Sequence, residues 1–205
     1  MQEYINIIIK SVFTENMIFA FFIGMCSYLA VSKTVKTSIG LGIAVIFVQM
    51  VTVPLNYLLL EKVLKPGALQ WLGESFTNVD LTFLSFMIYI ATIAAMVQLV
   101  EMIVEKFSPS LYNSLGIFLP LIAVNCAILA GSLFMEQREY QNIGEVLSFS
   151  FGSGFGWALA IVTLAAIRER IRYSNIPAPL RGLGITFIIT GLLGIAFMSF
   201  MGIKL

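Results

Sequence analysis

The sequence predicts an all-α integral membrane protein with six transmembrane helices. Of its 205 residues, 59% are hydrophobic and only 11% are charged, whereas soluble domains carry about 25% charged residues. A spanning helix needs about 20 mainly apolar residues. Backbone polar groups inside lipid must pair within their own segment, which favours helices over other structures. Six stretches meet the length requirement: 11–32, 39–60, 81–100, 114–135, 147–167 and 183–203.

Two of these stretches are expected to be broken near the bilayer midplane. Gly24 loosens the first stretch, and Pro120 removes a backbone hydrogen bond from the fourth. The sixth is expected to be interrupted at Gly191 and Gly194. Broken helices present partly positive N-terminal N–H groups inside the membrane, and these suit bound anions.

The distribution of Lys and Arg predicts the orientation. Six spans place both termini on one side, with five basic residues, and the opposite side carries seven. Because basic residues accumulate on the cytoplasmic side, both termini are expected in the periplasm. The seven cytoplasmic residues would be Lys33, Lys36, Lys106, Arg168, Arg170, Arg172 and Arg181.

An internal repeat divides the chain into residues 1–109 and 110–205. Cys26 and Cys126 are each followed four residues later by Ala and six residues later by Ser. Further along, Ser38-Ile-Gly-Leu-Gly42 matches Ser150-Phe-Gly-Ser-Gly154. Three spans per half make the second copy enter the membrane from the opposite face, the plan of many transport proteins. Chance similarity between apolar stretches is the alternative.

Cys26 and Cys126 are the only cysteines, and the chain has no histidine. A buried cysteine is often just a small apolar residue, and a disulfide is a second alternative. Their equivalent repeat positions favour a shared metal site near the pseudo-two-fold axis. An iron–sulfur cluster normally takes four thiolates. A cluster here would therefore need a second subunit, either a homologue or another copy of this chain.

The third stretch ends with polar side chains that suit a Na+ pathway. Gln98, Glu101 and Glu105 share one helical face, and an acid inside a membrane is a functional candidate. The alternative, favoured for Glu105, is an acid solvated at the membrane surface. The net charge of +1 gives no indication of nucleic-acid binding.

Several motifs resemble the E-subunit family of the bacterial Na+-translocating NADH:quinone reductase, and the resemblance covers essentially the whole chain. The motifs are Phe22-Ile-Gly-Met-Cys26 with Ala30-Val-Ser-Lys33, Leu115-Gly-Ile-Phe-Leu-Pro-Leu121 with Asn125-Cys126, Ala166-Ile-Arg-Glu-Arg170, and Pro179-x-Arg-Gly182.

The resemblance implies a membrane component of a six-subunit complex in the bacterial inner membrane. In that family, electrons pass from NADH through flavin and iron–sulfur carriers to ubiquinone while Na+ is expelled. A homologous D subunit of opposite topology supplies two further cysteines to an intramembrane 2Fe–2S cluster. Carried over, Cys26 and Cys126 would be this chain's ligands, and the chain would relay electrons without binding NADH or quinone itself.

Two alternatives remain open at this point. The A subunit of the Rnf ferredoxin:NAD+ reductase shares several of these motifs and implies the same cluster with a different donor and acceptor. A redox-inactive transporter could instead use an inverted repeat for alternating access.

Overall fold

A computed structural model describes residues 2–65, 82–107, 112 and 119–202, and all regular elements within these ranges are helical. In chain order they are α1 (Gln2–Ile9), the π-helix η1 (Lys10–Thr14), α2 (Met25–Val31), α3 (Val35–Leu59), the π-helix η2 (Leu60–Leu64), η5 (Thr82–Leu84), α4 (Ser85–Phe107), α6 (Leu119–Ala123), α7 (Cys126–Gln137), α8 (Ile143–Ile171), η7 (Ala178–Leu180), α9 (Leu183–Met198) and η8 (Ser199–Gly202).

Three of these helices are long and apolar enough to cross a membrane. They are Val35–Leu64, Ser85–Phe107 and Ile143–Ile171, of 30, 23 and 29 residues. The 16-residue α9 is apolar but shorter. These four helices correspond to the second, third, fifth and sixth expected spans. Residue 81 of the third stretch and residues 114–118 of the fourth lie outside the described residues.

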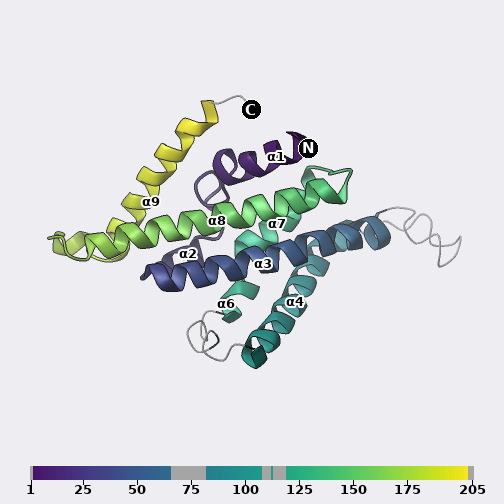
Figure 1. The fold of residues 1–205 in the computed structure, drawn as a ribbon, viewed down its shortest axis with the longest axis horizontal. Coiled ribbons are helices and arrows are strands. Elements are labelled where there is room, and N and C mark those ends of the chain that lie inside the picture. Colours follow the sequence, from purple (N-terminus) through teal and green to yellow (C-terminus); the bar gives the residue numbers. More distant parts are fainter. Residues whose placement is uncertain (1, 66–81, 108–111, 113–118, 203–205) are drawn as a thin grey trace, which may run out of the picture.

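The helices α3 and α8 run antiparallel along each other and form the centre of the molecule (Figure 1). Their closest approaches are at glycines. A Cβ atom on Gly42 would lie 2.9 Å from Cβ of Ala158, and one on Gly154 would lie 3.1 Å from Cα of Ile46. Gly42 precedes Gly154 by 112 residues, and Ile46 precedes Ala158 by the same number. The contact is therefore reciprocal, as a two-fold relation between the helices requires.

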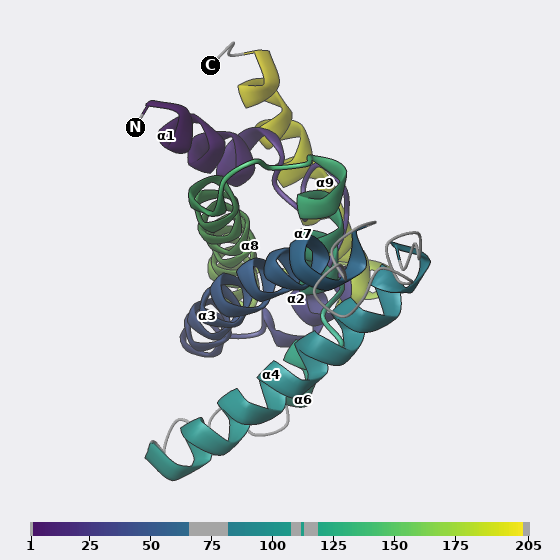
Figure 2. The ribbon, with the colours of Figure 1, turned by 90° about the vertical axis from the view of Figure 1, so that its right-hand side faces the viewer.

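The other helices pack around this pair. The N-terminal α1 lies against α8, and α7 lies against α3. In both views α4 lies on one side of the pair, with α1 and α9 on the other (Figures 1 and 2). Large apolar side chains on the outer helices face outward, such as Met87 at 69% exposure and Leu192 at 62%. Such outward-facing apolar helices are suited to lipid or to partner helices.

The glycines of the last helix do not have the expected effect. The helix α9 continues without a break through Gly191 and Gly194. A glycine weakens a helix by only about 0.5–1 kcal/mol relative to alanine. The backbone hydrogen bonds of an apolar helix cost more than that to lose in lipid. The expected interruption of the sixth stretch was wrong.

Candidate metal centre

The first expected span is interrupted between η1 and α2, and Asn16 holds the interruption in place. Its fully buried side chain donates through Nδ2 to the carbonyls of Val12, at 3.0 Å, and Gly156, at 2.9 Å. Its Oδ1 accepts from the backbone N–H of Ile18 at 3.0 Å. The irregular stretch ends at Gly24, whose left-handed φ of 86° precedes α2. Cys26 is the second residue of that helix.

The fourth expected span is interrupted at Val124 and Asn125. The helix α6 ends at Ala123, and α7 begins at Cys126. The Asn125 side chain accepts a hydrogen bond from the N–H of Ala127 at 3.1 Å and so caps α7. The break was expected at Pro120, but that residue lies within α6. Proline is tolerated in the first turn of a helix, so the cap at Asn125 marks the break instead.

The two interruptions meet at Gly24. A Cβ atom there would lie 2.9 Å from Cβ of Ala127 and 3.2 Å from Oδ1 of Asn125. It would also lie 2.7 Å from Nε1 of Trp157, a fully buried side chain on α8. Only glycine fits both the backbone angle and this space. The first turns of α2 and α7 are thereby brought next to each other.

Cys26 and Cys126 lie side by side at this junction. The thiol of Cys26 is close enough to act electrostatically on the thiol of Cys126. Both are free thiols, and both are exposed on the surface of the chain. Each cysteine occupies the first turn of its helix. The two cysteines are one hundred positions apart in the sequence.

The donor set fits half of a metal centre. Among the described residues, no group of three or more His, Cys, Asp or Glu side chains is close enough to hold a metal ion. Two adjacent thiols that face out of the chain can supply two ligands of a four-thiolate cluster. Within the described part of the chain, Nδ2 of Asn125 and Nε1 of Trp157 are buried donors without a hydrogen-bond partner.

Comparison with known proteins places the chain in a family. The model of the Rnf-Nqr family, described as "Rnf-Nqr subunit, membrane protein", matches residues 4–204. The chain belongs to the Rnf-Nqr family of membrane proteins.

Three of its relatives are each named as the E subunit of a Na+-translocating NADH-quinone reductase. The proteins of Rhodopirellula baltica and Psychrobacter cryohalolentis are each 59% identical to this chain, and that of Methylococcus capsulatus is 58% identical. Each match covers 100% of this chain, and 99%, 100% and 100% of the respective relatives.

The structure does not bring Gln98 or Glu101 to the cysteine pair of this Rnf-Nqr chain. Both lie in the second half of α4, Gln98 exposed and Glu101 half-buried. The C-terminal end of α4 projects away from α3 and α8 (Figure 2). Among the described residues, Glu101 forms no ion pair.

Sequence reasoning missed the ion pairs of Glu15, which lie beside the interruption of the first expected span. Glu15 forms ion pairs with Lys10, at 3.0 Å, and with Arg138. Arg138 also donates to Oη of Tyr140 at 3.2 Å and lies 4.9 Å from the ring centre of Phe149. Burial raises the pKa of Tyr140 and keeps it a neutral acceptor at ordinary pH. Glu15 and Arg138 are 123 residues apart, so no local pattern could have paired them.

Proposed function

We propose that this chain is a membrane subunit of a Na+-translocating NADH:quinone reductase and holds half of an intramembrane 2Fe–2S cluster. The observation that carries the proposal is the convergence of Cys26 and Cys126 at the surface of the chain. The names of the relatives support the choice of complex. On this proposal the chain lies in the bacterial inner membrane with both termini in the periplasm.

The ligand count requires a partner. Two thiolates from this chain leave two positions of a four-thiolate cluster unfilled. A homologous D subunit with the same pair of interrupted helices would supply them, within a six-subunit complex. When bound, the cluster supplies a one-electron relay between carriers on the two sides of the bilayer.

This chain's own residues position the two thiols. Gly24 and Asn125 end the irregular segments, so both cysteines fall in the first turn of a helix. Trp157 packs directly behind Gly24 and keeps the rear of the pair free of water.

Two inverted three-helix repeats, residues 1–109 and 110–205, explain the contacts at the centre of the molecule. The reciprocal approaches of Gly42 and Gly154 across α3 and α8 support this arrangement. The same symmetry would relate Cys26 to Cys126 and the first interruption to the second. Six spans then require the first and fourth to cross the membrane as broken helices.

Gln98 and Glu101 are proposed to take part in Na+ movement. Their oxygens suit a hard cation, and α4 carries them at a mostly exposed position where a neighbouring subunit could complete a site. The variant Glu101→Ala should weaken the Na+ stimulation of NADH oxidation while the cluster persists. An unchanged Na+ dependence would remove Glu101 from the pathway.

Membranes from a strain that lacks this chain test the proposed complex. We expect Na+-stimulated electron transfer from NADH to ubiquinone to be lost and to return with the wild-type chain. Loss of ferredoxin:NAD+ activity instead would identify the Rnf alternative. Na+ or solute flux through the isolated chain in liposomes, without iron, would favour a redox-inactive transporter.

A further inference from the structure

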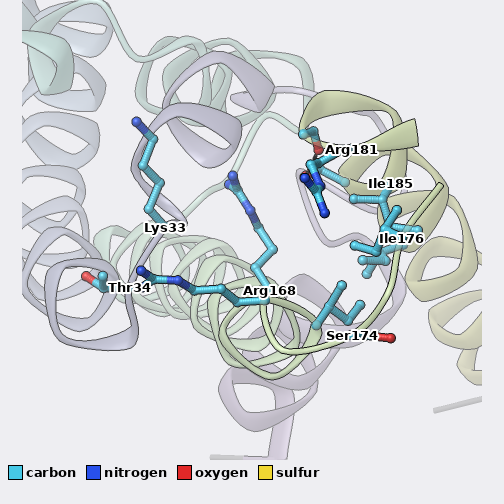
Figure 3. A pocket seen from close by; sticks show the side chains of 12 residues that line it. Lys33, Thr34, Arg168, Ser174, Ile176, Arg181 and Ile185 are labelled. Atoms are coloured by element: carbon cyan, nitrogen blue, oxygen red, sulfur yellow. Dashed lines mark hydrogen bonds between the residues drawn. The ribbon is translucent and has the colours of Figure 1, made fainter. Parts of the chain in front are cut away.

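A basic cavity of about 490 Å³ lies at the end of α8 that carries its arginines. It is enclosed by the start of α3, the last turns of α8, the connection that follows, and the first turns of α9. Figure 3 shows Lys33, Arg168 and Arg181 reaching this space from three separate segments. No cysteine lines this first cavity.

The charge of the cavity is of one sign. Its lining includes Lys33, Arg168, Arg172 and Arg181, and it contains no carboxylate. Nη1 of Arg168 donates to the carbonyl of Leu29, at 3.0 Å, and to Oγ of Ser32, at 2.7 Å, which fixes this side chain in place. Within the described part of the chain, none of the four basic residues forms an ion pair. Clustered cations without counter-charges favour an anionic ligand.

The remainder of the lining is mainly apolar, with Thr34, Ser174 and Thr186 as its polar members. Four isoleucines contribute to it, at positions 171, 176, 185 and 189. Along α9 the cavity extends from Gly182 to Ile189, which is about 10 Å at the rise of a helix. One end of the cavity is therefore basic, while its side wall follows an apolar helix.

A second hollow of about 520 Å³ continues the first. It shares Lys33, Arg168 and Gly182 with the first hollow and adds Cys26, Leu29 and Leu183. Leu183 is 62% exposed at the start of α9. Lys33 and Arg168 line both hollows, whereas Arg172 and Arg181 line only the first. The two hollows together form a groove with these four basic side chains and a mainly apolar remainder.

We propose that this groove binds an anionic phospholipid, with its phosphate among the four basic side chains and an acyl chain along α9. Basic pockets between helices at the cytoplasmic surface suit acidic headgroups. A free phosphate would leave the isoleucine wall uncovered. An acidic peptide from a partner would place backbone polar groups against that wall, at a cost in free energy. The mixed lining therefore favours a lipid over both.

Photo-crosslinking in the purified complex tests this site. The probes are phosphatidylglycerol and phosphatidylcholine, each with a diazirine on the acyl chain, added in detergent micelles, and the readout is crosslinking to residues 176–189 by mass spectrometry. The double variant Arg172→Gln with Arg181→Gln removes two cations that line the cavity. The matched control is Arg170→Gln with Lys36→Gln: both are exposed, neither lines the cavity, and Arg170 faces another hollow.

We expect phosphatidylglycerol to label this segment more strongly than phosphatidylcholine. Each cation near an anionic headgroup is worth about fivefold in affinity, so the cavity variant should bind roughly 30-fold more weakly, while the control keeps wild-type labelling. Equal labelling by both lipids, or equal loss in both variants, would overturn the proposal. If millimolar inorganic phosphate reduces the labelling as strongly as unlabelled phosphatidylglycerol does, the site would be assigned to free phosphate. Loss of a partner subunit from the cavity variant alone would assign it to a protein contact.

Discussion

Arg168 donates a hydrogen bond to Oγ of Ser32 at 2.7 Å, which ties the end of α8 to the residue that follows α2. The other half of the chain contains the counterpart of this bond. Nδ2 of Asn56 on α3 donates to Oγ of Ser132 on α7 at 2.8 Å. Asn56 and Arg168 are 112 residues apart, the spacing of Gly42 and Gly154. Each cysteine-bearing helix is therefore anchored to the long helix of the opposite half.

Removing the Ser132 hydroxyl should destabilise the chain, because Nδ2 of Asn56 would be left buried without an acceptor. For Ser132→Ala we expect a loss of about 1 kcal/mol in the free energy of unfolding, a typical cost inside a membrane. Thermal unfolding in detergent measures it. Adding Asn56→Leu to Ser132→Ala should recover most of the loss, because no polar group is then left unpaired. A double variant less stable than Ser132→Ala would contradict this explanation.

Gly24→Ala should disrupt the junction of the two interruptions. The new Cβ would lie 2.7 Å from Nε1 of Trp157, at a φ of 86°. The angle and the overlap together should cost at least about 2 kcal/mol, measured as a lower melting temperature. Gly191→Ala is the matched control, because nothing lies within 4 Å of its new Cβ. That variant should be unchanged or more stable by about 0.5–1 kcal/mol. Equal effects of the two would refute the role of Gly24.

The two thiols should form an intramolecular disulfide when no metal protects them. The chain has two cysteines, and they are neighbours. After purification with an iron chelator and mild oxidation, titration with a thiol-reactive dye should fall from two reactive groups per chain to none, without dimers on a non-reducing gel. The Cys26→Ser chain should keep one reactive thiol. If the oxidised wild-type chain still has two thiols that react with the dye, the cysteines are not adjacent.

The apolar stretches predicted the helices because hydropathy and length suffice to define a spanning segment. They did not predict helix breaks equally well. The break at Gly24 was predicted correctly, because this residue has a positive φ that favours glycine. The second break was predicted at Pro120, which is the wrong position. Proline is costly only inside a helix, and the break follows the cap at Asn125.

The sequence suggested part of the candidate site but none of the contacts between distant residues that hold it. The expected repeat led to the prediction that Cys26 and Cys126 lie together. The bond from Asn16 to the carbonyl of Gly156 joins residues 140 positions apart, through a backbone atom that every residue has. No sequence pattern marks such a partner. The structural role of Arg168 was hidden for a related reason, since an arginine at the end of a span usually serves as a topology signal.

The iron content of the purified complex tests the shared cluster most directly. Cys26→Ser, Cys126→Ser and the double variant should each lose the iron and the electron paramagnetic resonance signal of a single 2Fe–2S cluster. The double variant should lose no more than either single variant, because both thiols would hold the same cluster. Wild-type iron in either single variant, or a greater loss in the double variant than in the singles, would contradict the account.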